Sequence, residues 1–187
     1  MQPKPESSAE EGATDAGANR PDAGASRDAF ESGDIEGVVV RDLRKFLDGR
    51  GWLAELFRDD ELPNEEFRPA MAYTSTTKPG VRRGPHEHAE QADFFCFIGP
   101  SNFKLRLWDN RPDSPTFGCV MTLRAGEDEP KSVIVPRGVV HAYENVGDRE
   151  GVVINFPNRL YKGERRAEPV DEIRHEDDPE TVFRLDD

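Results

Sequence analysis

The sequence predicts an all-β protein, a sandwich or barrel of short strands. From Ile35 onward, short apolar runs rich in Val, Phe and Ile follow one another, and Gly, Pro, Asn and Asp separate them. In one run Phe103, Leu105 and Leu107 alternate with basic residues, the period of two that is typical of a strand with one buried face. Many short strands with turn residues between them and almost no long helix are typical of this fold class.

The expected strands are short and rich in β-branched and aromatic residues, which favours strand over helix. In chain order they cover residues 35–40, 51–57, 69–76, 93–98, 102–108, 119–123, 132–136, 139–143 and 152–156. Local helical patterns occur only at 41–47 and 171–177. The highly charged segment from residue 162 is expected to run over the surface and close one end of the barrel. The fold therefore ends in a short helical or irregular C-terminal segment.

Composition divides the chain into a tail and one domain. Residues 1–33 are rich in Ala, Gly, Ser, Pro and acidic residues. Such a segment cannot bury enough apolar surface to offset the entropy lost on ordering, so we expect a disordered acidic tail. Residues 34–187 hold the apolar runs and are expected to form a single domain, because a chain of this length suits one core.

The charge balance excludes several kinds of partner. The chain has 38 acidic residues against 25 Lys and Arg, a net charge of −13. A surface this acidic repels nucleic acid and anionic membranes. The N-terminus has no apolar signal segment, and no run approaches ~18 apolar residues. Cys96 and Cys119 are the only cysteines and form no CxxC motif, which favours reduced thiols. We therefore expect a cytoplasmic protein with neither nucleic-acid nor membrane partners.

Three of the four histidines fall in two patterned segments. His86 and His88 are two apart in an extended run, so their side chains are expected to share one face, and Asp93 follows them. His141 and Tyr143 share a face in the same way. Three imidazoles and one carboxylate form a ligand set used by Zn, Fe, Mn or Ni. The pattern therefore predicts a possible divalent metal site at His86, His88, Asp93 and His141, with exposed turn residues as the alternative.

The two segments resemble the paired motifs of the cupin superfamily. Pro136, Gly138, His141 and Asn145 match P-x-G-x-x-H-x-x-x-N, and the segment 86–99 matches the motif that begins with HxH. Cupins fold as a double-stranded β-helix, or jelly roll, with the site inside it. The resemblance therefore implies a cupin jelly roll for residues 34–187.

A narrower resemblance covers roughly residues 34–178. The runs 83–86 (RGPH), 109–118 (DNRPDSPTFG), 135–141 (VPRGVVH) and 175–178 (HEDD) are similar to motifs of the dTDP-4-dehydrorhamnose 3,5-epimerase family. The resemblance implies epimerisation of a nucleotide-linked 4-keto sugar, such as a dTDP-4-keto-6-deoxyhexose, in deoxysugar or surface-polysaccharide synthesis. The epimerisation requires no cofactor, and the resemblance also implies a homodimer.

The resemblance also implies roles for individual residues. His86 would be the base that removes a proton beside the ketone, and Asp177 (or Asp178) would orient it. Arg83 and His141 would line the substrate site. Glu55 and Arg58, in and just after an early segment that fits the family, would bind substrate as well. Trp52, Leu56 and Phe57 are the residues expected to be buried in the dimer.

Two chemical roles of the family are vacant in this chain. The family's enolate-stabilising lysine falls on Asp93, and its proton-donating tyrosine falls on Asn155. Tyr143 could replace the tyrosine, and a metal could replace the lysine. A metal bound by His86 would prevent that residue from acting as the base. Two alternatives therefore stay open: a metal-dependent cupin enzyme, either an isomerase or a dioxygenase, and a non-catalytic sugar-binding cupin.

Overall fold

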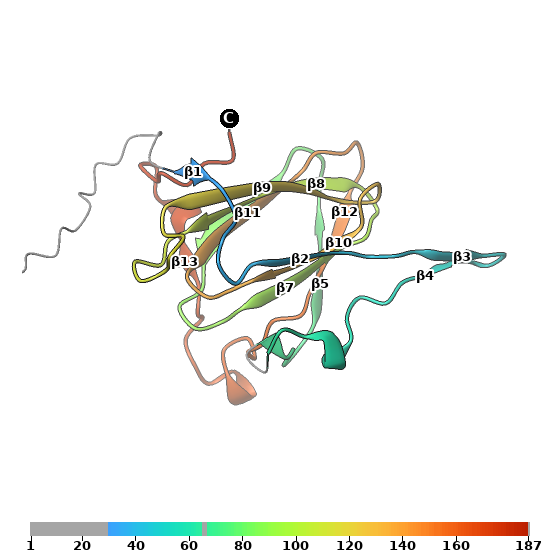
Figure 1. Ribbon diagram of the computed structural model, residues 1–187, viewed down its shortest axis with the longest axis horizontal. Coiled ribbons are helices and arrows are strands. Elements are labelled where there is room, and N and C mark those ends of the chain that lie inside the picture. The colour runs from blue at the N-terminus through green and yellow to red at the C-terminus, as the bar shows by residue number, and fades with distance from the viewer. Residues whose placement is uncertain (1–29, 65–66, 187) are drawn as a thin grey trace, which may run out of the picture.

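Two β-sheets face each other in the computed structural model, which describes residues 30–64 and 67–186 (Figure 1). The six-stranded sheet has the order β1 (Glu31–Ser32), β9 (Cys119–Gly126), β8 (Asn102–Asp109), β11 (Val139–Asn145), β6 (Arg82–Glu87) and β13 (Ile173–Arg174). The five-stranded sheet has the order β2 (Val39–Asp42), β10 (Lys131–Val135), β7 (Asp93–Phe97), β12 (Gly151–Asn155) and β5 (Tyr73–Thr77). The fold class is the all-β jelly roll expected from the sequence.

Smaller elements lie outside these two sheets. Strands β3 (Phe46–Asp48) and β4 (Gly51–Leu53) form a hairpin that projects from the body. Within residues 30–64 and 67–186, single-turn 3-10 helices occur at η1 (Asp59–Glu61), η3 (Glu164–Arg166) and η4 (His175–Asp177). Among the described residues, no helix is long and apolar enough to span a bilayer.

The core lies between the two sheets and follows from the alternation in the sequence. On β8, Phe103, Leu105 and Leu107 are buried and pack against Phe95 and Phe97 of the facing sheet. Strand β7 is buried along its whole length, because the chain before β5 covers its second face. Apolar residues on both faces of β7 explain why its sequence shows no alternation.

Two local expectations of helix need correction. Residues 41–47 contain no helix: β2 continues to Asp42, which pairs with Lys131 of β10, and β3 begins at Phe46. The β-branched pair before this segment commits the chain to strand, and pairing with β10 overrides the weak helical pattern. In the segment 171–177 the structure has the short strand β13 and then η4, so only its last turn is helical.

The predicted tail extends too far. Phe30 packs on Phe183 with ring centroids 5.6 Å apart. Strand β1 pairs in parallel with β9, in the register Glu31↔Cys119. The domain therefore starts by residue 30, three residues before the end of the predicted tail, while residues 1–29 lie outside the described part of the chain.

The run 109–118 closes a loop around one buried carboxylate. Asp109 has no exposed surface and accepts hydrogen bonds from Arg111 Nε at 2.8 Å and from the hydroxyls of Ser114 and Thr116, each at 2.6 Å. Burial opposes the charged form of Asp109, but these donors outweigh it and lower the pKa of the carboxyl to about 2. The run 109–118 therefore stabilises its own loop, and none of its residues lines the pocket described below.

Replacing Asp109 with Asn is expected to lower the free energy of unfolding at neutral pH by about 2 kcal/mol. The folded-state pKa lies below the ordinary value, so this stabilisation is complete above about pH 4 and is lost as the pH falls toward 2. Urea unfolding between pH 7 and pH 3 measures it, with the exposed Asp148→Asn as control. The difference between wild type and D109N should shrink as the pH falls, and a constant difference would contradict the linkage.

Candidate functional site

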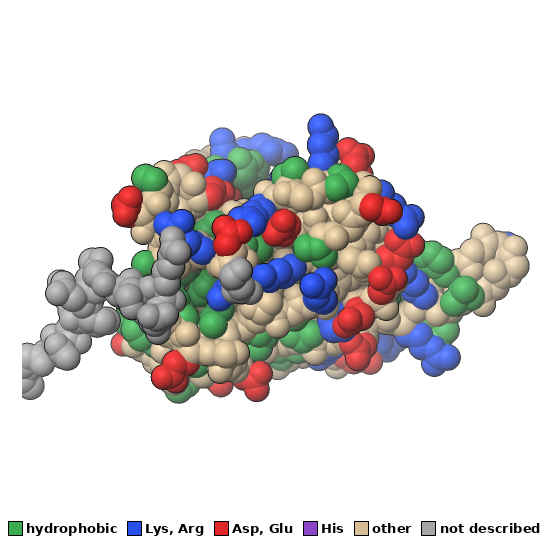
Figure 2. Space-filling model, turned by 90° about the horizontal axis from the view of Figure 1, so that it is seen from above, with side chains coloured by type: hydrophobic (Ala, Val, Ile, Leu, Met, Phe, Trp, Pro, Cys, Tyr) green, Lys and Arg blue, Asp and Glu red, His purple; other side chains and the backbone are tan. Residues whose placement is uncertain are grey.

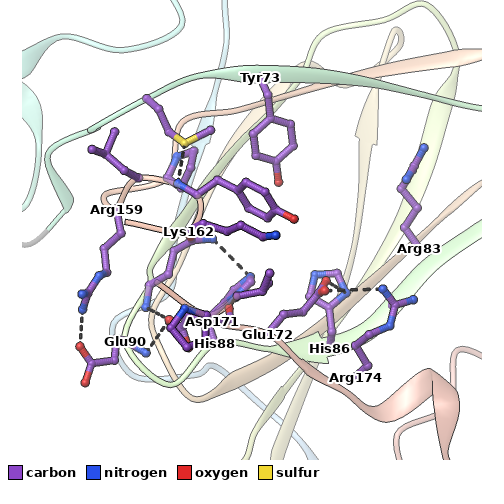
Figure 3. Close-up of a pocket in the computed structure, with 18 of the residues that line it drawn as sticks. Tyr73, Arg83, His86, His88, Glu90, Arg159, Lys162, Asp171, Glu172 and Arg174 are labelled. Carbon is purple, nitrogen blue, oxygen red and sulfur yellow. Dashed lines mark hydrogen bonds and ion pairs between the residues drawn. The ribbon is translucent and has the colours of Figure 1, made fainter. Parts of the chain in front are cut away.

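A cavity of about 1010 Å³ opens between strands β5 and β6 and the chain that follows β12 (Figure 3). Both sheets contribute to it, since β5 belongs to the five-stranded sheet and β6 to the six-stranded one. The segment 157–176 supplies much of the remaining lining. His86 and His88 lie in its lining, which makes the cavity the candidate active site.

His86 lies on β6, between His141 of β11 and Arg174 of β13. Its side chain is 17% exposed and lines the cavity, and its Nδ1 lies 4.0 Å from Glu172 Oε1. Burial first, and then the charges of His141 and His88, lower the pKa of His86 to about 2. The ring is therefore neutral at physiological pH and keeps a lone pair with which to accept a proton.

A tight cluster lies beside His86. Asp93 Oδ2 lies 3.1 Å from His88 Nε2 and 3.2 Å from His141 Nε2. One donor atom each from His86, His88, Asp93 and His141 lies within 4.8 Å of the others. The structure thus brings together the four residues named as a possible metal site. His88 lines the cavity, whereas His141 and Asp93 are buried behind it.

The electrostatics of the cluster are dominated by Asp93. Burial alone would raise the pKa of this carboxyl, but hydrogen bonding and charge from His141 and His88 hold it well below the usual range. Burial likewise disfavours the charged form of His88, but Asp93 and the Asp171 carbonyl outweigh that effect and raise the pKa of His88 to about 9. An ionised carboxylate therefore faces the two imidazoles.

The second nitrogen of each imidazole is already engaged. His141 Nδ1 lies 3.1 Å from the Val139 carbonyl, and His88 Nδ1 contacts the Asp171 carbonyl. A carbonyl only accepts, so each Nδ1 must carry a proton and donate it. In a neutral ring that leaves the Nε2 lone pair pointing at Asp93 Oδ2. The arrangement requires either protons on both Nε2 atoms or a cation among these atoms.

Tyr73 and Asn155 form a second polar unit that joins β5 to β12. Asn155 Nδ2 donates to Tyr73 Oη at 2.8 Å and to Asp93 Oδ1 at 2.8 Å. Asn155 Oδ1 accepts from the Phe94 amide at 3.0 Å, which fixes the orientation of the side-chain amide. Burial first, and then the charge of Asp93, raises the pKa of Tyr73 to about 12, so its hydroxyl stays protonated.

Tyr143 lies deeper than expected for a pocket residue. It is 6% exposed, and its ring packs against Phe95, Phe97 and Phe103. Its hydroxyl lies 3.3 Å from Ser75 Oγ and reaches the lining of the cavity. Burial raises the pKa of Tyr143. It is mainly a core aromatic with one polar atom at the edge of the site.

Cations gather along the cavity despite the net charge of −13. Arg83 donates to Thr77 Oγ1 at 3.0 Å and to the Thr76 carbonyl at 2.8 Å, and forms no ion pair within the described residues. Lys162 and Arg166 flank the ring of Tyr161 at 5.8 and 6.0 Å from its centroid. These positive groups can hold a doubly charged ligand such as a diphosphate.

Three predicted site residues lie elsewhere. Asp177 pairs with Arg174 at 3.2 Å and is 70% exposed, so the expected contact with His86 is wrong. The carboxylate nearest to His86 is Glu172, because β13 pairs with β6 and brings the preceding residue to the imidazole. Glu55 and Arg58 pair with each other at 3.5 Å in the exposed chain before η1 and do not line the cavity.

Sequence reasoning missed Tyr73, Glu172 and Lys162. The alternation Tyr73, Ser75, Thr77 marks one polar face of β5 and could have indicated Tyr73. Glu172 and Lys162 stand in charged runs, where nothing separates a pocket residue from a solvated one. Their places depend on where the C-terminal segment crosses the sheet.

Known proteins similar to this chain include sugar epimerases. A curated relative, the probable low-salt glycan biosynthesis epimerase Agl13 of Haloferax volcanii, is 40% identical over 129 residues, which are 68% of this chain and 81% of the relative. The spore coat polysaccharide biosynthesis protein SpsL of Bacillus subtilis is 36% identical over 148 residues, 79% of this chain and 93% of SpsL.

The fold is also that of solved structures. A dTDP sugar isomerase from Desulfovibrio desulfuricans G20 superposes with a TM-score of 0.68 at 20% identity, covering 78% of this chain and 87% of that one. The family profile described as dTDP-4-dehydrorhamnose 3,5-epimerase matches residues 32–178, which span most of the chain and include both sheets. This chain therefore belongs to the dTDP-4-dehydrorhamnose 3,5-epimerase family.

Proposed function

We propose that the chain epimerises a nucleotide-linked 4-keto sugar, such as a dTDP-4-keto-6-deoxyhexose, during the synthesis of a surface glycan or polysaccharide. The observation that carries the proposal is His86. It is a neutral imidazole at the wall of a large cavity, with a carboxylate beside it and cations nearby. Family membership and relatives named for epimerisation and polysaccharide synthesis support the same reaction.

In this proposal His86 removes the proton on a carbon beside the ketone. The C–H bond breaks, its electron pair enters the enolate, and the proton moves to the imidazole. Glu172, 4.0 Å from Nδ1, favours the imidazolium that forms. It stands near the imidazole in place of Asp177, but at this distance it acts through its charge and not through a hydrogen bond. A second proton, delivered from the opposite face, then bonds to the enolate carbon and inverts it, while solvent takes the first proton from the imidazole.

Arg83, Lys162 and Arg166 are proposed to bind the diphosphate. Each lines the cavity, and no ion pair with a carboxylate engages them within residues 30–64 and 67–186. Tyr161 lies beside Lys162 and Arg166 and is 49% exposed, so its ring offers a face on which a nucleobase can stack. His141 is buried behind His86 and is proposed to shape the site without touching the sugar.

The test is incorporation of deuterium from solvent. Incubated in deuterated water with a dTDP-4-keto-6-deoxyhexose, the protein should place deuterium at C3, C5 or both, as followed by NMR and mass spectrometry. Binding of the nucleotide sugar without any exchange would favour a non-catalytic sugar-binding protein. Neither binding nor exchange with several keto sugars would contradict the proposal.

A second candidate, a metal-dependent enzyme, is favoured by one observation. His88 and His141 each donate through Nδ1 to a main-chain carbonyl and direct Nε2 at Asp93 Oδ2. Metal-bound histidines are held in this way, and Asp93 Oδ2 and His141 Nε2 have no hydrogen bond of good geometry. These three residues fit a divalent ion, and His86 is the fourth potential ligand. Such an ion supplies a Lewis acid that polarises an oxygen.

Epimerases of this family require no metal, so metal content separates the two candidates. Protein purified without a chelating tag should be analysed for Zn, Fe, Mn and Ni, and cobalt(II) titration should be followed by visible absorption. A stoichiometric metal that His88→Ala removes would support the second candidate. Full deuterium exchange in metal-free protein would leave only the first.

We also propose that two copies associate through the hairpin β3–β4. Figure 2 shows apolar side chains on this projecting arm. Leu47 is 82% exposed, Leu53 65% and Trp52 52%, an unusual apolar surface for a monomer. By contrast, Leu56 and Phe57, predicted to lie in the dimer contact, pack on Phe94 and its neighbours within the same chain.

The two free cysteines support a reducing, cytoplasmic location.

The association predicts a dimer at micromolar concentration in light scattering. The double substitution Leu47→Glu and Leu53→Glu should yield a monomer with an unchanged core, because both side chains are largely exposed and neither belongs to a core cluster. Thermal unfolding and circular dichroism serve as controls for folding. A wild-type monomer, or a dimer that survives this substitution, would contradict the proposed contact.

A further inference from the structure

We infer that Tyr73 is the residue that delivers the proton to the face of the sugar opposite His86, and that Asn155 positions it. The inference rests on the proposed epimerase function and names a catalytic residue that the sequence motifs do not mark. Inversion needs an acid and a base on opposite faces of one carbon, so the question is which hydroxyl faces His86 across the cavity.

The topology of the two sheets decides between the tyrosines. His86 lies on β6 of the six-stranded sheet, and Tyr143 lies on β11, which pairs directly with β6. Tyr73 lies on β5, the edge strand of the five-stranded sheet on the other side of the cavity. Figure 3 shows Tyr73 reaching into the cavity from one side, with His86 on the other. A sugar between the sheets therefore has His86 on one face and Tyr73 on the other.

The hydrogen bonds around Tyr73 leave its proton available. Because the Phe94 amide fixes Asn155 Oδ1, the Asn155 amide must donate through Nδ2, and it does so to Tyr73 Oη at 2.8 Å. Tyr73 Oη is thus an acceptor in this contact, and its own O–H has no acceptor within the described residues. The hydroxyl is free to donate to a bound sugar. Tyr143, in contrast, shares its hydroxyl with Ser75 at 3.3 Å.

Tyr73 can replace the tyrosine that the family has at position 155, because the two positions are direct neighbours on adjacent strands. The family's tyrosine falls on Asn155 of β12, and Asn155 pairs directly with Tyr73 of β5 in the ladder. In this chain the phenol therefore lies one strand away in the same sheet, on Tyr73, and the Asn155 side-chain amide holds it by a hydrogen bond. When Tyr73 gives its proton to carbon, the same Asn155 N–H stabilises the phenolate.

The proposed step balances without a further reagent. The Tyr73 O–H bond breaks, its proton forms the new C–H bond with the enolate carbon, and the electron pair stays on the phenolate oxygen. Solvent then reprotonates Tyr73 and removes the proton held by His86. The net change is inversion at one carbon.

The test compares exchange with inversion in Tyr73→Phe. In deuterated water with a dTDP-4-keto-6-deoxyhexose, His86 of this variant can still remove the proton and return a deuteron to the same face. We expect exchange within about threefold of wild type, and inversion reduced about 100-fold or more, the usual contribution of a general acid. The KM should change little, because the aromatic ring is kept.

Controls separate this role from others. Thr74→Val removes a hydroxyl from the same strand but outside the cavity lining and should leave both rates unchanged. Inversion by Y73F within threefold of wild type, loss of inversion in Tyr143→Phe in its place, or an equal loss of exchange and inversion in Y73F would each overturn the inference and leave the epimerase proposal standing. Absence of exchange in wild type would overturn both.

Discussion

Replacing His86 with Ala is expected to abolish both deuterium exchange and inversion. His86 is the neutral imidazole of the cavity wall, whereas the pKa of His88, the other histidine in the lining, is raised to about 9 by Asp93, so that ring is already protonated. Loss of a positioned general base typically lowers the rate by roughly 10²- to 10⁴-fold. NMR of the sugar in deuterated water measures both rates in one experiment.

Folding is not expected to limit the H86A experiment. His86 Nδ1 has no hydrogen bond, so its removal leaves no partner unsatisfied. Circular dichroism and nucleotide binding provide the check, and Glu172→Gln gives a graded comparison because it removes only the charge beside the imidazole. Exchange at the wild-type rate in H86A would refute the assignment of His86 as the base.

Replacing Asp93 with Asn is expected to lower the free energy of unfolding by about 3 kcal/mol. Asp93 is buried, and its Oδ2 is shared by His88 and His141 at 3.1 and 3.2 Å. Removing its charge leaves the raised-pKa imidazole of His88 without its counter-charge, and a broken buried pair costs more than the intact pair contributes. Urea unfolding near pH 7 measures the loss.

The D93N variant also distinguishes a cluster that holds only protons from one that binds a metal ion. With protons alone, the difference between wild type and D93N should not depend on chelator. With a bound divalent ion, wild type should lose stability in EDTA while D93N does not, because ligands that bind only the folded state add stability. Asp148→Asn, at a fully solvated carboxylate, controls for a general charge effect. A loss below about 1 kcal/mol would contradict a charged, paired Asp93.

The sequence allowed prediction of those parts that depend on local pattern. The strand at 102–108 and the shared face of His86 and His88 follow from alternation, because residues two apart on a strand share a face, while the resemblance to cupin motifs brought Asp93 and His141 into the same cluster. A helix at 41–47 was wrong, because pairing with β10 overrides weak local propensity.

The missed residues depend on long-range contacts. Glu172 reaches His86 only because β13 adds to the edge of β6, and the Tyr73 hydroxyl is held by a hydrogen bond from Asn155 of the adjacent strand. No short spacing in the sequence marks either contact, because the partners are 82 or more positions apart. Resemblance to the family suggested a carboxylate at position 177 beside His86, whereas the structure has Glu172 there, five residues earlier.

The two-residue strand β13 has a consequence for how the site is assembled during synthesis. The paired strands of both sheets end at Asn155, apart from β13, whereas Glu172 and Arg174 arrive with the last part of the chain. Phe183 and Leu185 then anchor that part against Trp108. All strands of both sheets except β13 therefore precede, in order of synthesis, the carboxylate that lies beside His86. A chain truncated before residue 172 would lack both this carboxylate and the two apolar residues that pack against Trp108.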